Sequence, residues 1–329
     1  METVASGIRP TGNLHLGNYF GAVKSFLKMQ DEYNCFFFIA DWHSLTTHPN
    51  PENLRRSVKT ILAEYLACGL DPEKATIYVQ SDIREVAELY LYLNMNAYLG
   101  ELERVTTFKE KVRAQPGNVN AGLLTYPTLM ASDIIIHRAV KVPVGKDQEQ
   151  NMEMARKFAR RFNTVYGVDF FPEPASFHLS EKAVKVPGLD GSGKMGKSEG
   201  NAIYLADDAN TIRKKVMRAV TDSGPTVPNS EKPEAVQNLF TMMEIVSGKE
   251  TIDYFNERYN ACEIRYGDMK KQLAADIDTF CAPIRERINE MMANEAYLEK
   301  VVRMGAEKAS ASASGTLNEV RRIIGFKPY

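Results

Sequence analysis

The sequence has little of what marks disulfide-stabilised or membrane-spanning proteins. The longest apolar run, residues 35–40, is far below the ~20 residues that span a bilayer, and no apolar segment precedes Arg9 as in a signal peptide. The few cysteines form no Cys-x-x-Cys pair and have no histidine at metal-ligand spacing; they are Cys35, Cys68, Cys262 and Cys281. We therefore expect a cytoplasmic protein with no membrane partner, whose reduced thiols are small core residues.

An excess of charge is also missing. The 329 residues hold 41 Lys and Arg against 42 Asp and Glu, a formal net charge of −1. Binding of nucleic acid by bulk charge is excluded, so any RNA contact must use local basic patches, and we expect no DNA partner. Residues 156–161 and 211–218 are locally basic, although solvated helix faces have the same pattern.

The first half of the chain alternates short apolar runs with helical periods, which favours βαβ units and a parallel sheet. We expect strands at residues 3–7, 35–40, 75–80 and 142–144, with helices at 17–33, 51–68 and about 147–162. The helix at 51–68 has the clearest ends, with Asn50 and Pro51 at its start and Gly69 after it. The fold class predicted is α/β, a Rossmann-like doubly wound parallel sheet with a second, all-helical domain.

Beyond about residue 202 the strand signals vanish and helical periods dominate. We predict a Rossmann-like domain over residues 1–199 and a helical domain over 200–284, joined to a last helix at about 285–329. Residues 224–233 read as a long loop rich in proline and glycine. Residues 309–315 are either a flexible linker or a helix of small residues.

Residues 6–18 follow the first strand and precede the first helix, where a parallel sheet binds nucleotides. Gly7, Gly12 and Gly17 would let the backbone approach a ligand, and His15 could donate to a phosphate. The segment is neither G-x-G-x-x-G nor a Walker A loop. A structural histidine near a turn is the alternative interpretation.

Residues 188–198 place glycines around Lys194 and Lys197, a composition that could bring positive charge onto a polyphosphate. An ordinary basic linker between two domains has the same composition. Neither this segment nor residues 6–18 decides the function alone.

Together the two segments resemble the paired motifs of class I aminoacyl-tRNA synthetases: His-x-Gly-Asn at residues 15–18, and Lys-Met-x-Lys-Ser at 194–198. The blocks at 100–111, 121–133, 142–148, 219–223 and 305–309 resemble the bacterial tryptophan branch of that family. The resemblance covers essentially the whole chain.

The resemblance implies two steps: a tryptophan carboxylate attacks the α-phosphorus of ATP, and the aminoacyl group then passes to the terminal ribose of tRNA(Trp). A carboxylate is already ionised at pH 7, so no general base is needed and catalysis is positioning plus charge neutralisation. No protein-held metal is expected, because Mg²⁺ travels on the ATP oxygens.

The same resemblance implies the ATP-site residues. Those given a catalytic role are His15, Lys111, Lys194 and Lys197. Those expected around the nucleotide are Arg9, Gly17, Asn18, Gly145, Asp147, Met195 and Ser198, together with the two loop lysines.

For the amino acid, Asp133 is the sharpest prediction, because an indole N–H only donates and a selective pocket needs one buried acceptor. Tyr126, Met130 and Asp133 lie at i, i+4 and i+7, on one face if the segment is helical. The resemblance adds Gln148, which with Tyr126 would hold the α-amino group, and also His43 and Val142, although plain core packing is an alternative for Met130 and Val142.

Two residues depart from the family pattern. Gly196 stands where the lysine motif usually has serine, and Arg9 where many bacterial relatives carry glutamine. Both motif lysines are present, so we expect an active enzyme.

Two other functions stay open. The tyrosine counterpart usually shows Gly-Gly-Ser-Asp-Gln where this chain has Val-Gly-Lys-Asp-Gln at 144–148. A synthetase-like protein that binds adenylate or RNA without charging tRNA is the other. The resemblance further implies anticodon recognition by the helical domain and a homodimer, for which the helix around residues 86–99 is a candidate interface that ordinary core would equally explain.

Overall fold

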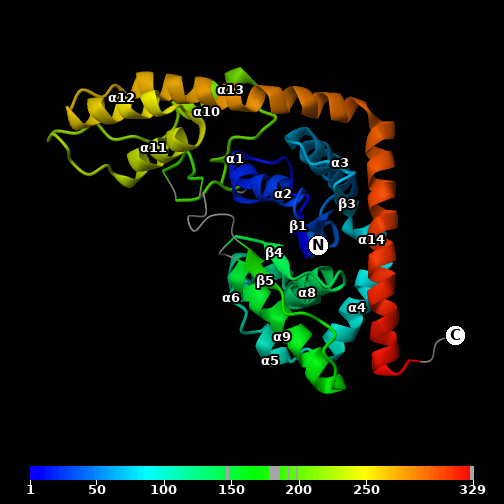
Figure 1. The fold of residues 1–329 in the computed structure, drawn as a ribbon. Helices are drawn as coiled ribbons and strands as arrows, with labels where there is room; N and C mark the ends of the chain where they lie inside the picture. Colours follow the sequence, from blue (N-terminus) through cyan, green and yellow to red (C-terminus); the bar gives the residue numbers. More distant parts are fainter. Residues whose placement is uncertain (146–147, 178–185, 192, 198, 327–329) are drawn as a thin grey trace.

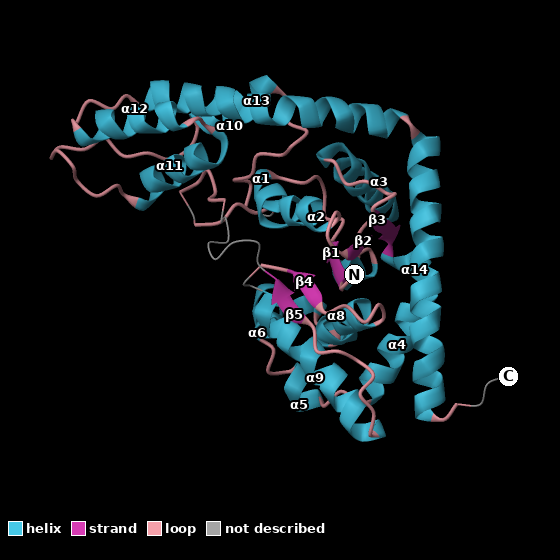
Figure 2. Ribbon diagram, in the orientation of Figure 1, coloured by secondary structure: helices cyan, strands magenta, loops and turns pink. Residues whose placement is uncertain are grey.

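A computed structural model describes residues 1–145, 148–177, 186–191, 193–197 and 199–326. Within them five strands form one parallel sheet in the order β3-β2-β1-β4-β5 (Figures 1 and 2). The strands are β1 (Thr3–Ile8), β2 (Asn34–Ile39), β3 (Ala75–Val79), β4 (Lys141–Pro143) and β5 (Ala175–Phe177). The parallel, doubly wound arrangement confirms the predicted fold class.

The strands are apolar on both sides because each side of the sheet is covered. Val4, Phe37 and Ile77 pack into one hydrophobic cluster, while Ala5 and Phe38 on the same strands pack into the other. This alternation follows from the two-residue period of a strand. In the register β1 lies against β2 from Thr3 opposite Asn34 onward, so the carboxyl ends of these strands lie level.

The helices of residues 16–166 lie on both faces of the sheet and at the ends of the strands (Figure 1). They are α1 (Leu16–Asn18), a π turn (Tyr19–Val23), α2 (Lys24–Met29), α3 (Pro51–Cys68), α4 (Arg84–Met95), α5 (Leu99–Leu102), α6 (Thr106–Ala114), α7 (Ala121–Leu124), α8 (Tyr126–Ile135) and α9 (Glu149–Tyr166). Short 3₁₀ turns occupy Trp42–Thr47, Gln80–Asp82 and Pro116–Asn118.

Helix α3 begins and ends where the sequence predicts. The Asn50 side chain accepts hydrogen bonds from the backbone N–H groups of Glu52 and Asn53, and Pro51 fills the first turn. Gly69 ends the helix in the left-handed region at φ 109°.

The remaining helices extend away from the sheet and then return to it. They are α10 (Ala209–Met217), α11 (Glu234–Val246), α12 (Lys249–Asn260), α13 (Tyr266–Ala293) and α14 (Glu295–Ile324). In Figure 1, α10 to α12 lie beside one end of α13, and the chain turns sharply at its other end so that α14 runs back along β3 and α4. The returning helix thus starts at Glu295, and residues 285–293 belong to α13.

Small residues let α14 approach the sheet closely. A Cβ added at Gly305 would lie 1.7 Å from the carbonyl oxygen of Ile77 in β3, so only glycine fits there. Ala309 and Ala313 are fully buried in the same contact. Residues 309–315 are therefore a helix of small residues, and the linker interpretation is wrong.

One strand and one cysteine differ from the predictions made from the sequence. Strand β5 was not predicted. The described cysteines are free thiols, but only Cys35, Cys68 and Cys281 are buried; the prediction of a core residue is wrong for Cys262, which is half-buried just after α12. Among the described helices, none combines the length and apolar character needed to cross a bilayer.

Candidate active site

The predicted nucleotide segment lies where the strand order changes direction. From β1 the chain continues to β2 on one side, whereas β4 lies on the other, so the end of β1 is a switch point of the sheet. Open α/β sheets bind ligands in the crevice outside the strand ends at such a point. Arg9 directly follows β1, and α1 begins seven residues later with Leu16.

His15 is held firmly at the start of α1. Its Nδ1 accepts from the backbone N–H of Asn18 (3.3 Å), and the Asn18 side-chain oxygen accepts from the backbone N–H of His15 (3.1 Å), a reciprocal cap. Residues on both sides pair with a later segment, since the N–H of Leu16 donates to the carbonyl of Ile203 and the N–H of Leu205 to that of Leu14. The structure therefore fixes the orientation of the imidazole.

Gly17 makes room for this ring. A Cβ at Gly17 would lie 2.9 Å from ring atoms of His15 and 3.6 Å from the Cβ of Met195. A side chain at position 17 would displace the imidazole or the lysine loop, which gives a local reason for glycine beside the predicted ATP ligand.

Burial and cations keep His15 neutral. Burial lowers its pKa to about 4, and the charges of Lys197 and Lys194 act in the same direction. Because Nδ1 accepts from Asn18, the neutral ring carries its proton on Nε2. His15 can thus donate one hydrogen bond to an anion at neutral pH.

Positive charges from three parts of the chain converge beside it. Burial lowers the pKa of Lys111 in α6 to about 8, and the nearby charge of Arg9 lowers it too. Burial likewise lowers the pKa of Lys197 to about 8, opposed by Glu64 and assisted by Arg9. The Arg9 Nε is buried and has no hydrogen-bond partner within the described residues. Such a cluster favours binding of a polyanion, which would relieve the mutual repulsion.

The two lysines of the second motif lie at the same site. The Lys197 Nζ donates to the carbonyl of Gly12 (2.7 Å), and Lys194 acts on His15 electrostatically. Met195, between them, is buried in the core, and its backbone N–H donates to the carbonyl of Val186. Two predicted ATP-site residues, Asp147 and Ser198, lie outside the described residues.

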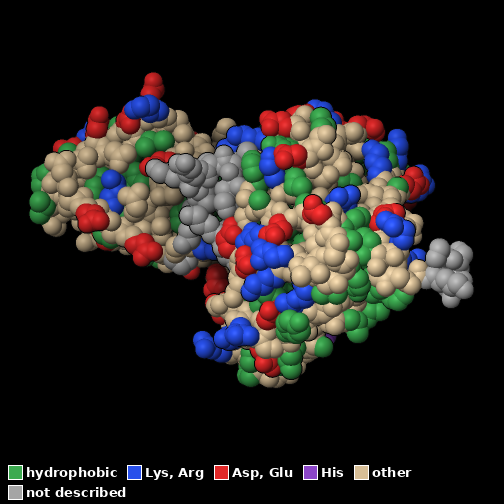
Figure 3. Space-filling model, turned by 60° about the horizontal axis from the view of Figure 1, so that its bottom comes forward, with side chains coloured by type: hydrophobic (Ala, Val, Ile, Leu, Met, Phe, Trp, Pro, Cys, Tyr) green, Lys and Arg blue, Asp and Glu red, His purple; other side chains and the backbone are tan. Residues whose placement is uncertain are grey.

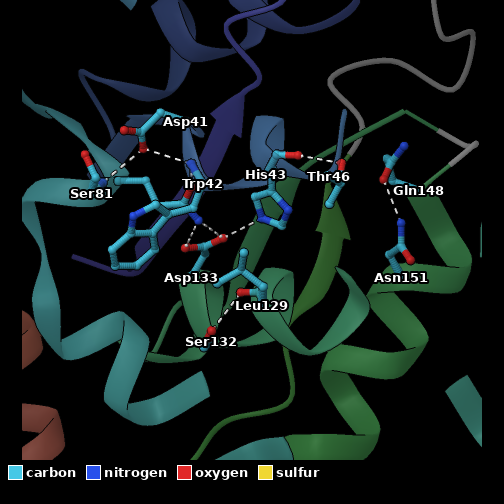
Figure 4. A network of polar contacts seen from close by, with 11 residues as sticks. Asp41, Trp42, His43, Thr46, Ser81, Leu129, Ser132, Asp133, Gln148 and Asn151 are labelled. Atoms are coloured by element: carbon cyan, nitrogen blue, oxygen red, sulfur yellow. Dashed lines mark hydrogen bonds and ion pairs between the residues drawn. The ribbon is translucent and has the colours of Figure 1, made fainter. Parts of the chain in front are cut away.

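Asp133 is buried in α8, which is helical as the spacing predicts, and two side chains make three polar contacts with its carboxylate. The Gln80 Nε2 donates to both of its oxygens (2.8 and 2.9 Å), and His43 Nε2 lies 2.9 Å from Oδ2 (Figure 4). Burial raises the pKa of Asp133, while the hydrogen bonds from His43 and Gln80 oppose that rise. The carboxylate is thus held in a defined orientation in a nearly dry site.

Tyr126 lies between the cations near His15 and the surroundings of the buried Asp133 carboxylate. Its ring centroid lies 4.3 Å from that of His43, and Lys111 Nζ lies 4.3 Å from its ring centroid. Burial raises the pKa of its hydroxyl, against the effect of the Arg9 charge. The acceptor Asp133 and the cation cluster are therefore neighbouring parts of one site, linked through Tyr126 and His43.

The other predicted tryptophan residues lie around this site less directly. Val142 in β4 is fully buried in the core, and Met130 is a partly buried neighbour of the same cluster. Gln148 is the N-cap residue before α9; its side-chain oxygen accepts from Asn151 (2.9 Å) and its backbone N–H donates to the carbonyl of Gly145 (2.9 Å).

Sequence reasoning missed two buried polar residues. Gln80 immediately follows β3, and besides Asp133 it binds the backbone N–H of Trp42 (3.0 Å) through its own side-chain oxygen. Glu64 lies on the buried face of α3 and accepts from the backbone N–H of Leu14 (2.8 Å). A charged residue among Ile61, Leu62 and Tyr65 on a core-facing helix was the available signal for Glu64.

A separate groove of about 740 Å³ lies between α3 and α14 and contains none of the predicted site residues; Asp41, Arg55 and Arg303 are among those that line it. Within the described parts of the chain, no three His, Cys, Asp or Glu side chains gather as a metal site.

Comparisons with known proteins agree with this geometry. Residues 2–282 match the family model described as tRNA synthetases class I (W and Y). A tryptophan–tRNA ligase of Porphyromonas gingivalis is 77% identical over 327 residues, which cover 99% of this chain and 100% of that protein. One from Clostridium tetani is 40% identical over 330 residues, covering 99% and 96%.

A solved structure adds the three-dimensional comparison. The tryptophanyl-tRNA synthetase of Campylobacter jejuni, complexed with ADP and tryptophan, is 33% identical with a TM-score of 0.87, covering 99% of this chain and 100% of that one. An archaeal tyrosyl-tRNA synthetase from Archaeoglobus fulgidus, at 18% identity and a TM-score of 0.66, shares the fold. From its family match, its relatives and its fold, this chain belongs to the class I tRNA synthetases of the tryptophan and tyrosine group.

Proposed function

We propose that the protein is a tryptophan–tRNA ligase that forms tryptophanyl-adenylate and pyrophosphate from tryptophan and ATP, then transfers the tryptophanyl group to tRNA(Trp). The observation that carries the proposal is the pairing of a cation cluster around His15 with a buried, oriented carboxylate, Asp133, in one site. The high identity to tryptophan–tRNA ligases over the whole chain supports it.

In the first step a tryptophan carboxylate oxygen bonds to the α-phosphorus while the bond from that phosphorus to the bridging oxygen of pyrophosphate breaks. Arg9, Lys111 and Lys197 neutralise charge that builds on the phosphate oxygens, and Lys194 adds to them. His15 donates from Nε2 to a phosphate oxygen and needs no change of protonation. No residue must act as a general base, because the attacking carboxylate is already ionised.

Bound phosphates also stabilise the protonated lysines. In the free enzyme the pKa values of Lys111 and Lys197 are lowered to about 8, so each is only partly deprotonated at neutral pH. An anion nearby raises both pKa values and favours the charged form. Mg²⁺ bound with ATP would supply further positive charge at the phosphates, beside Lys111 and Lys197.

For the amino acid, the indole N–H donates to Asp133. Ionised Asp133 has about four acceptor positions, and Gln80 and His43 use three of them. One position on Oδ1 is left for a single donor, which suits an indole. The α-amino group is held by Tyr126 and Gln148, and the indole ring is lined by Met130, Val142 and His43. The nucleotide site is completed by Asp147, Gly145, Asn18, the Met195 backbone and Ser198.

The helical domain, residues 200–284, reads the anticodon, and the enzyme works as a homodimer. Exposed apolar side chains on α4 and α5 support the dimer, because Leu91, Met95, Tyr98 and Leu99 are 51–74% exposed. Figure 3 shows hydrophobic side chains gathered on the face of the catalytic half that is turned forward.

The test is aminoacylation of two purified tRNAs, tRNA(Trp) and tRNA(Tyr), each assayed separately with labelled tryptophan and with labelled tyrosine. Charging of tRNA(Trp) alone is the expected result. A tyrosine ligase would instead charge tRNA(Tyr) with labelled tyrosine, and a protein that only binds adenylate or RNA would charge neither; either result contradicts the proposal.

A further inference from the structure

Gln80 is an amide with no exposed surface at the carboxyl end of β3. Burying an amide is costly unless its donors and its acceptor are paired. The partners of Gln80 come from two other parts of the chain, Trp42 after β2 and Asp133 in α8. The chemistry of these partners decides which way the amide faces.

The backbone of Trp42 fixes the orientation of the amide. A backbone N–H can only donate, and the N–H of Trp42 lies 3.0 Å from Gln80 Oε1. The flipped amide would set two donors against each other at this contact. The oxygen of Gln80 therefore faces Trp42, and its NH₂ group faces Asp133.

Asp41 connects the same two strand ends. Its Oδ1 accepts from the backbone N–H groups of Trp42 and Ser81, each at 3.0 Å (Figure 4). Ser81 directly follows Gln80, so the backbone on both sides of the amide contact is held in place. Gln80 thus has a fixed position as well as a fixed orientation.

The NH₂ group of Gln80 lies across the fork of the Asp133 carboxylate, because its nitrogen is 2.8 Å from Oδ1 and 2.9 Å from Oδ2. His43 Nε2 contacts Oδ2 as well (2.9 Å), so the open side of the carboxylate is on Oδ1. A proton inside the fork would meet the NH₂ group, donor against donor. Gln80 therefore favours Asp133 as a pure acceptor.

We propose that Gln80 is a positioning residue for amino-acid selection, whose amide, fixed by the Trp42 backbone, holds Asp133 as an acceptor with one open position for an indole N–H. The inference rests on the proposed function, in which that N–H donates to Asp133. A ring of the same shape without the N–H leaves a buried acceptor unpaired, so the site rejects it.

Gln80→Met tests this directly, because methionine has a similar length and cannot donate to Asp133. The N–H of Trp42 keeps its bond to Asp41, so the strand ends stay connected. The readout is kcat/KM in pyrophosphate exchange, with tryptophan and with benzothienylalanine, whose ring has sulfur in place of the indole N–H.

We expect the preference of Gln80→Met for tryptophan over benzothienylalanine to be lower than that of the parent by about 10-fold or more, because only tryptophan uses the oriented acceptor. A purely structural role would lower both kcat/KM values by the same factor. An unchanged preference in the folded variant would overturn the proposal.

The matched control is Thr76→Val, a buried polar residue in the same strand, which should leave the preference unaltered. If Gln80→Met does not fold, Gln80→Asn replaces it. Asparagine is one methylene shorter, so its amide is drawn away from both Trp42 and Asp133, and we expect the same direction of change. A folded Gln80→Asn with the preference of the parent would contradict the role of Gln80.

A spectroscopic measurement is independent of catalysis. Tryptophan labelled with ¹⁵N in the indole reports the proton resonance of its N–H when bound, and a hydrogen bond to a carboxylate moves that resonance downfield. We expect the resonance to lie further upfield in Gln80→Met than in the parent. Equal positions in both proteins would refute the orientation of Asp133 by Gln80.

The two measurements separate this proposal from the proposed function. A parent protein that binds tryptophan without activating it would contradict the proposed function, and the indole resonance would still decide the role of Gln80. An enzyme selective for tryptophan whose Gln80→Met variant is equally selective would remove only that role. A parent protein that binds no tryptophan would overturn both.

Discussion

At the scale of single residues, Lys111 and Lys197 are charged in the free protein at a cost in free energy, because they are buried near Arg9 and their pKa values are lowered. A bound polyphosphate would offset that free energy by bringing negative charge to the two ammonium groups. Lys197→Ala should therefore reduce adenylate formation about 100-fold or more, the usual effect of losing a charge-stabilising donor, while tryptophan affinity changes less than about threefold. Pyrophosphate exchange and equilibrium tryptophan binding measure the two effects.

The matched control is Lys271→Ala, an exposed lysine on α13 whose loss should leave exchange unaltered. If Lys197→Ala exchanged pyrophosphate as fast as that control, the role given to the lysine loop would be wrong.

Asp133 tests the amino-acid half of the site. Asp133→Ala leaves Gln80 and His43 without their shared acceptor and removes the group that we propose accepts the indole N–H. We expect kcat/KM for tryptophan to fall by about 100-fold or more and preference over phenylalanine and tyrosine to be largely lost. Competition in pyrophosphate exchange measures both.

Ser132→Ala is the control for Asp133, because Ser132 is equally buried in α8 and its hydroxyl donates back to the carbonyl of Leu129 (Figure 4). It should change kcat/KM by less than about threefold. Selectivity retained in Asp133→Ala would refute the indole assignment.

At the scale of elements, α14 depends on close contact with β3. Gly305→Ala would drive a Cβ into the carbonyl of Ile77, so the helix or the strand end must shift. We expect a loss of about 2 kcal/mol or more in unfolding free energy, as for overpacked cores. Denaturant unfolding measures it.

The same helix provides its own control. Gly315 has open space around it, so Gly315→Ala should stabilise the protein by about 0.5–1 kcal/mol through helix propensity. If the two substitutions gave equal effects, the contact between α14 and β3 would not be as tight as the structure has it.

The helices and strands also show which parts of the fold could be predicted from the sequence. Helix α3 was predictable because Asn50, Pro51 and Gly69 are local signals for its ends. Strand β5 was not, because three residues, Ala175–Phe177, form an edge strand too short for a period to be read. The break near Asn294 did have a local signal that the sequence prediction overlooked, because the Asn294 side chain caps α14 by accepting from the backbone N–H of Tyr297 (3.2 Å).

Some residues of the site could be predicted from the sequence and others could not. His15 follows the first predicted strand, and the Lys-Met-x-Lys-Ser motif at 194–198 lies between the two predicted domains. Gln80 and Glu64 have no motif: their roles depend on which backbone amides and side chains the fold brings to them, here Trp42, Asp133 and Leu14. Only the structure supplies those pairings.

At the scale of the whole molecule, the proposed dimer rests on the exposed apolar side chains of α4 and α5. Leu91 and Met95 lie one turn apart on α4 and are 51% and 74% exposed. Replacing both by Glu should convert a dimer of twice 37.0 kDa to a monomer, with the unfolding free energy of each chain little changed otherwise. Sedimentation equilibrium measures the mass.

Val227→Glu serves as the control, since Val227 is 61% exposed but lies in the helical half. A parent protein that sediments as a monomer would contradict the proposed dimer, and a dimer that survives both Glu substitutions would place the interface elsewhere.

The central claim is that one site joins a phosphate-binding cation cluster to an acceptor built for indole. Amino-acid-dependent exchange of labelled pyrophosphate into ATP tests both parts at once, with tryptophan and tyrosine run side by side in the presence of Mg²⁺. The account predicts exchange with tryptophan and a rate with tyrosine lower by about 10⁴-fold, the discrimination typical of sites built around one hydrogen bond. Exchange with tyrosine at a comparable rate, or no exchange with either amino acid in folded protein, would contradict it.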